Sequence, residues 1–194
     1  MKITDKTKQK MAKQRLRRIK SYYNAYDKGY DLYNDKFEKY VVTVKKELNG
    51  QYYLIVRNKF GALSLQKLVY NGWVRMVPVS REGRQYAENK SIFDSWFKEA
   101  QDEVNRRILS YYNFAPRHVY INSNKDINEK YKVVLKKQFN DNYYFVLQSE
   151  SGKYIVTQIV LYEDFNVLVV TKKEFDKYKT IFVSWINEAR RTFD

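Results

Sequence analysis

One eight-residue segment occurs twice in this chain and decides how the rest is interpreted. RRIKSYYN at residues 17–24 returns as RRILSYYN at residues 106–113, with seven of eight positions identical at an offset of 89. Residues 40–70 also match residues 131–161, at nine of 31 positions and an offset of 91. The matches keep the same order along the chain, which indicates a tandem duplication.

Each repeat contains four short segments of strand-forming residues with turn signals between them. Asn49-Gly50 and Asn71-Gly72 are the clearest signals, because both residue types tolerate the positive φ of a tight hairpin. Such short connections predict antiparallel neighbours. The expected strands are 40–48, 51–58, 62–70 and 73–79 in the first repeat, and 131–139, 142–149, 153–162 and 165–171 in the second.

An amphipathic helix is predicted after each group of strands. IFDSW at residues 92–96 returns as IFVSW at 181–185, and apolar residues recur around both at helical spacing. Trp96 and Trp185 lie on these stripes, so we expect them in the core. The first of these helices spans about residues 90–113 and is shared between the repeats.

The predicted fold class is α+β, a tandem duplication of a four-stranded antiparallel meander plus helix. The element order is α-ββββ-α-ββββ-α, with pseudo-twofold symmetry. Its parts are a basic N-terminal helix at residues 1–26, a first ββββα repeat at 27–112 and a second at 113–194. Each sheet is expected to pack a helix on one face.

Composition excludes several chemistries. The chain has 194 residues, no Cys and one His, which excludes disulfides, thiolate nucleophiles and a site of several histidines. It also lacks the glycine-rich phosphate motifs and the nucleophile elbow. We therefore expect a protein that is not an enzyme and uses no cofactor or metal. No apolar run reaches the about 20 residues of a membrane span. A cytoplasmic protein without a membrane partner is expected.

Positive charge is concentrated at the N-terminus. The chain carries a net charge of +15, and its first 20 residues hold nine Lys or Arg and one acidic residue. These cations surround the helix, so local ion pairs cannot neutralise them. A polyanion is the expected partner, and a solvated arm that only confers solubility is the alternative. The candidate phosphate contacts here are Lys8, Lys10, Lys13, Arg15, Arg17, Arg18 and Lys20.

An outward sheet face is the second candidate surface. Val42 and Val44 are expected to face a helix. Alternation along the next strand then turns Tyr53 and Arg57 outward, where rings and cations suit bases and phosphates. Tyrosines that only stiffen a strand are the alternative. The candidates on the sheets are Lys45, Tyr53, Arg57 and Arg75 in the first repeat, and Lys136 and Tyr144 in the second.

The arginine pair of the repeated segment lies outside its apolar stripe. Arg106 and Arg107 repeat the pair at residues 17–18, and guanidinium groups suit phosphates or the carboxylates of a partner. Both pairs are therefore candidate nucleic-acid contacts.

The order ββββα taken twice resembles the Whirly-type single-strand DNA binders and the related transcriptional-coactivator domains. This resemblance lies in element order, covers both repeats and implies single strands bound on sheet faces; the basic N-terminal helix has no counterpart in it. The first expectation is a nucleic-acid-binding protein acting on DNA or RNA. The alternative is a protein-binding inhibitor of phage or mobile-element origin, such as an anti-CRISPR-like antagonist of a host nucleoprotein complex, because exposed Tyr and Arg are preferred interface anchors.

Overall fold

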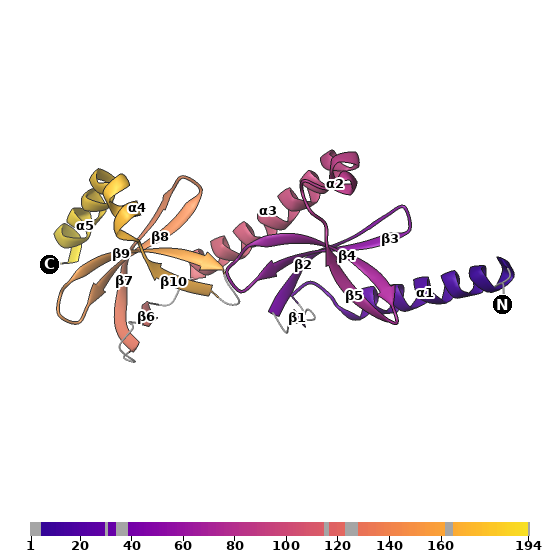
Figure 1. Cartoon of the computed structure of the whole chain (residues 1–194). Helices are drawn as coiled ribbons and strands as arrows, with labels where there is room; N and C mark the ends of the chain where they lie inside the picture. The colour runs from indigo at the N-terminus through magenta and orange to yellow at the C-terminus, as the bar shows by residue number, and fades with distance from the viewer. Residues whose placement is uncertain are drawn as a thin grey trace. The chain divides into compact units, whose positions relative to one another are not determined.

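The computed structural model describes residues 5–29, 31–33, 39–114, 117–122, 128–161 and 165–193. The fold is α+β, as expected, with two antiparallel sheets and helices (Figure 1). The chain divides into two compact units, here called unit 1 (Met1–Val104) and unit 2 (Asn105–Asp194).

Unit 1 contains a sheet with strand order β1-β2-β3-β4-β5. Asn49 and Gly50 close the β2–β3 hairpin with φ values of 50° and 70°, which explains why this pair marks the turn. The elements are α1 (Asp5–Ala25), β1 (Asp31–Tyr33), β2 (Lys39–Leu48), β3 (Gln51–Asn58), β4 (Leu63–Asn71), β5 (Trp73–Pro78), α2 (Arg84–Glu88) and the first part of α3 (Lys90–Phe114).

Unit 2 contains a sheet with strand order β10-β9-β8-β7-β6. After the last part of α3 come β6 (His118–Asn122), β7 (Asn128–Phe139), β8 (Asn142–Ser149), β9 (Tyr154–Leu161), β10 (Phe165–Val169), α4 (Lys172–Lys177) and α5 (Lys179–Phe193). All the strands that the sequence predicts form close to their expected bounds in both units.

Each sheet also has a fifth strand, so the expected four-stranded meander is wrong. β1 pairs with β2 through Leu32 and Tyr40, and β6 pairs with β7 through Val119 and Tyr131. Both strands are short and lie outside the strands predicted from the sequence. The alternation of HVYIN at residues 118–122 is a strand signal that could have revealed β6.

A β-bulge in β2 changes which residues share a face. The register shifts between Val42 and Val44, and the matching shift in β7 lies between Val133 and Leu135. An extra residue reverses the alternation of side chains. Val42 therefore packs on one side of the sheet and Val44 on the other. The expectation that both valines face one helix is wrong for this reason.

Helices cover both faces of the sheet in unit 1, rather than the one face expected. One face packs against α2 and the first part of α3, through Tyr86, Phe93, Trp96 and Ala100. The other packs against the end of α1, through Ile19, Tyr22, Tyr23 and Tyr26. The second cover therefore comes from the segment RRIKSYYN and the residues just after it.

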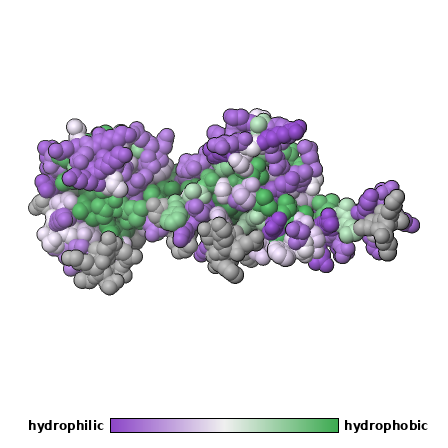
Figure 2. Space-filling view, viewed as in Figure 1, coloured by the Kyte–Doolittle hydropathy of each residue, from purple (hydrophilic) through white to green (hydrophobic). Residues whose placement is uncertain are grey.

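The sheet of unit 2 is covered in the same way. α4 and α5 cover one face, with Phe182, Trp185 and Ala189 buried. The other face packs against Ile108, Tyr111 and Tyr112 near the end of α3. Figure 2 shows hydrophilic residues on the outer side of α4 and α5, and hydrophobic residues gathered toward the sheet. Both copies of the repeated segment thus supply the second cover of a sheet.

Replacing Trp96 or Trp185 by alanine should destabilise the protein by about 3–5 kcal/mol in each case. The two residues are only 8% and 9% exposed and belong to core clusters, as expected from the sequence. Trp73→Ala is the matched control, since Trp73 is 64% exposed, and should change stability by about 0.5 kcal/mol. Urea unfolding of the three variants measures this, and equal losses would contradict the core assignment.

Candidate nucleic-acid interface

The N-terminal part of α1 projects beyond the residues that hold the helix to the sheet. No residue of α1 is buried, and every side chain from Asp5 to Arg18 is exposed. Figure 1 shows α1 extending away from its sheet toward the N-terminus. We call residues 5–18 the projecting part of α1. Lys, Arg, Gln, Met, Ala and Leu dominate it, and all favour helix.

The projecting part of α1 is strongly basic. Asp5 is its only acidic residue, and Asp5 contacts Lys8 at 3.5 Å in an exposed pair that contributes little stability. Arg18 stacks on Tyr70 of β4, with its guanidinium carbon 5.7 Å from the ring centroid. The exposed cations of α1 are Lys6, Lys8, Lys10, Lys13, Arg15, Arg17, Arg18 and Lys20.

The projecting part of α1 also lacks the residues that dock the other helices. At the repeat offset of 89, Trp96 and Ala100 of α3 correspond to Thr7 and Met11 of α1. In α3 that tryptophan and alanine pack onto a sheet, and α5 repeats both of them. Thr7 stands at the position of the aromatic anchor, and the residues around it are mostly cations, so this segment is suited to solvent or to a charged partner.

Three sheet residues expected on an open face are buried. Tyr53, Arg57 and Tyr144 are 2%, 1% and 1% exposed. The expectation is wrong because α2 and α3 cover the face with Tyr53, and α4 and α5 cover the face with Tyr144. Each tyrosine hydroxyl bonds to a short helix. Tyr53 accepts from Gln85 at 2.7 Å, and Tyr144 donates to Glu174 at 3.2 Å.

Two sheet lysines occupy matching positions at the ends of helices. Lys45 lies 4.6 Å from the ring centroid of Tyr23 in α1 and 3.5 Å from the carboxylate of Asp27. Lys136 donates to the carbonyls of Tyr112 and Asn113 at 2.7 and 3.1 Å, near the end of α3. A cation there satisfies the last carbonyls and the helix dipole. Both lysines therefore have structural partners.

The remaining arginine candidates differ in exposure. Arg75 of β5 is half-buried, and its Nε atom has no hydrogen-bond partner in the described structure. Arg106 and Arg107 are exposed on α3. The guanidinium carbon of Arg107 lies 5.9 Å from the ring centroid of Phe165. The predicted residues thus come together along α1 but not on a shared sheet face.

A group of exposed residues on the surface of unit 2 lies outside the set predicted from the sequence. His118 and Tyr120 of β6 are exposed and lie opposite Lys132 and Lys130 of β7. The alternation of β6 could have revealed the strand. The pairing with β7 could not be found from any local pattern.

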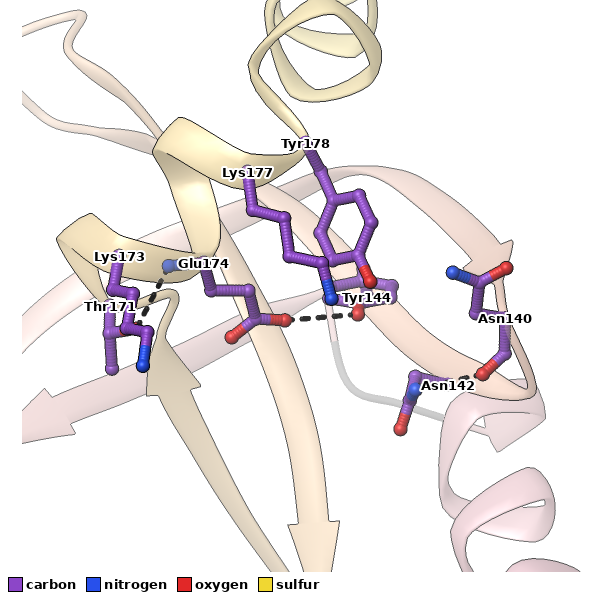
Figure 3. A pocket seen from close by; sticks show the side chains of 8 residues that line it. All are labelled: Asn140, Asn142, Tyr144, Thr171, Lys173, Glu174, Lys177 and Tyr178. Carbon is purple, nitrogen blue, oxygen red and sulfur yellow. Dashed lines mark hydrogen bonds between the residues drawn. The ribbon is translucent and has the colours of Figure 1, made fainter.

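A cavity of about 310 Å³ lies beside α4 in unit 2 (Figure 3). Thr171 accepts a hydrogen bond from the Glu174 amide at 3.3 Å and caps the helix, which places the Glu174 carboxylate at the Tyr144 hydroxyl. Burial, and then the charge of Glu174, raises the pKa of Tyr144 to about 12. Among the described residues, no three His, Asp or Glu side chains form a metal-binding group.

No protein-family model matches this chain, and no significant match is found among curated proteins or solved structures. The resemblance in element order to the Whirly-type proteins therefore gains no support from a known fold, and the fifth strand of each sheet departs from it. Within the described part of the chain, no helix combines the length and apolar character needed to cross a membrane.

Stability should fall as the pH rises from about 10 toward 12. Tyr144 keeps its proton in the folded protein because its pKa is raised to about 12, whereas an unfolded tyrosine ionises near pH 10. The stabilisation that protonated Tyr144 gives the folded protein is therefore complete below pH 10 and is lost as the pH rises toward 12. Urea unfolding at several pH values should give a shallower decline for Tyr144→Phe. Glu174→Gln should lower the pKa of Tyr144 only partly, because burial is the largest cause of the raised pKa. Identical declines in wild type and Tyr144→Phe would contradict this assignment.

Proposed function

We propose that the protein is a non-enzymatic nucleic-acid-binding protein that contacts phosphates through the projecting part of α1. The observation that carries this proposal is a helix segment with seven exposed cations, one acidic residue and no buried side chain. Cations all round a helix act as interchangeable point charges and do not read base sequence. Release of counterions from the nucleic acid supplies the affinity. The cytoplasm is the proposed place of action.

We also propose that the two units arose by tandem duplication. Matched bulges in β2 and β7 support it, as do matched ion pairs from strand to helix, Lys46 with Glu99 and Lys137 with Glu188. A further support is a matched trio of rings in each core. In unit 1 the ring centroids lie 5.5 Å apart for Tyr53–Phe93, 5.7 Å for Tyr53–Trp96 and 5.1 Å for Phe93–Trp96. In unit 2 the matching distances are 5.6 Å for Tyr144–Phe182, 5.6 Å for Tyr144–Trp185 and 5.3 Å for Phe182–Trp185. The pseudo-twofold relation stays a prediction.

An apolar stripe on α1 favours a second candidate function. Met11 and Leu16 are 42% and 44% exposed, and they line a shallow cavity of about 430 Å³ with Ala12 and Ile19. An amphipathic helix with apolar and basic sides suits an acidic groove on another protein. The second candidate is therefore a protein-binding inhibitor that docks through α1.

Removing charge from the projecting part of α1 should weaken nucleic-acid binding and flatten its salt dependence. The variant Lys10→Gln, Lys13→Gln, Arg15→Gln removes three exposed cations from this segment. The log–log slope should fall by about 0.7–0.9 for each phosphate that is no longer neutralised. The charge-matched control is Arg84→Gln, Lys90→Gln, Lys98→Gln, whose cations already pair with carboxylates.

Salt titrations of wild type, variant and control with DNA and RNA measure these slopes. Equal slopes for wild type and variant would reject α1 as the phosphate contact. Met11→Ser with Leu16→Ser separates the two candidate functions. If α1 contacts phosphates, this variant should keep the nucleic-acid affinity of the wild type. If α1 docks on a protein, the variant should lose that docking, because docking needs these apolar side chains.

A further inference from the structure

Rings and cations lie side by side on one face of the unit 2 sheet. β6 and β7 pair so that His118 stands opposite Lys132. Tyr120 stands opposite Lys130 in the same way. All four residues are exposed, and Tyr120 is 64% exposed. Alternation places the four on one face, because Val119 between the two rings is buried on the other. We call these four residues the β6–β7 face.

The helix that covers the rest of this sheet face ends beside the β6–β7 face. Lys132 Nζ lies 5.3 Å from the ring centroid of Phe193, the last residue of α5. A cavity of about 340 Å³ opens here, lined by His118, both lysines and residues of the β8–β9 turn. The described structure therefore leaves this part of the sheet open to a ligand.

The charge of this surface is positive. Of the nearby carboxylates, Glu129 accepts a hydrogen bond at 2.7 Å from the hydroxyl of Tyr131. Glu150 lines the cavity at the β8–β9 turn, beside two lysines. Lys130 and Lys132 are both exposed, and Lys132 stacks on Phe193, an aromatic ring that does not neutralise its charge. The ammonium groups of both lysines can therefore contact phosphates.

We propose that the β6–β7 face binds single-stranded nucleic acid. Tyr120 and His118 are two residues apart on one strand, about 6.8 Å, so each ring can stack on a separate base. Lys130 and Lys132 contact the phosphates beside those bases. A duplex hides the faces of its bases, so this arrangement selects a single strand. The inference rests on the proposed function for the class of ligand, and adds strandedness and a second site.

The matching positions in unit 1 repeat half of this surface in sequence. Leu32 and Tyr40 pair as Val119 and Tyr131 do, so the register places Tyr33 and Lys39 where unit 2 has Tyr120 and Lys130. Asp31 and Val41 stand where unit 2 has His118 and Lys132, and Val41 is buried, 7% exposed. The second ring and the second exposed lysine of the β6–β7 face therefore have no counterpart at these positions of unit 1.

Binding of the full chain to an oligothymidylate, an oligouridylate and a DNA duplex of equal length tests the proposal by fluorescence anisotropy. Tyr120→Ala with His118→Ala should weaken both single strands about tenfold or more and leave duplex affinity unchanged. Tyr120→Phe should retain the affinity, because it keeps a ring. The difference between the two single strands shows whether DNA or RNA is preferred.

Lys130→Gln with Lys132→Gln should lower the salt slope for single strands by about 0.7 for each phosphate that these lysines neutralise. The matched control is Lys172→Gln with Lys179→Gln, which removes two exposed lysines from α4 and α5. All substituted side chains are exposed, and equal melting temperatures show that folding is intact.

Unchanged single-strand affinity in the Tyr120→Ala, His118→Ala variant would overturn the inference. If the α1 charge variant still loses affinity, the proposed function survives that result. If wild type binds none of the three probes, the proposed function and the inference both fail.

Discussion

Helices pack on both faces of each sheet, and this double cover determines the rest of the structure. One sheet followed by one helix leaves a face uncovered, so each unit takes its second cover from the helix that precedes it. α1 provides that cover in unit 1 through Tyr22 and Tyr23, and α3 provides it in unit 2 through Tyr111 and Tyr112. Both occurrences of the repeated segment place their Ile and Tyr residues in a cover, while their arginines stay exposed.

Turns and helices could be predicted from this sequence, but side-chain faces could not. Asn49-Gly50 fixes a hairpin by its positive φ, and the spacing around Trp96 fixes a buried stripe. The bulge at Thr43 leaves no mark on local periodicity, yet it puts Val42 and Val44 on opposite faces of the sheet. Tyr53 and Arg57 follow the expected alternation of β3, but both are buried because a helix covers each face of the sheet. The basic helix could be found because uncompensated charge is visible in composition. The β6–β7 face could not, because it depends on which residue of β7 stands opposite Tyr120.

Net charge overstates how many cations can bind a partner. Lys136 holds the end of a helix, and Lys137 joins its strand to α5 through Glu188. Lys45 and Lys46 have corresponding roles in unit 1. The structure therefore divides the basic residues into those that hold helices to sheets and those that face solvent. Only the second group, which includes the cations of the projecting part of α1 and of the β6–β7 face, can exchange counterions for phosphates without a cost to the fold.

The continuity of α3 has a consequence for how the chain folds. Its residues up to Val104 belong to unit 1, and its residues from Ile108 onward pack in the core of unit 2. Starting a helix is the slow and unfavourable step, and extending one is easy. When unit 1 folds during synthesis, it supplies a helix end from which the cover of unit 2 can grow.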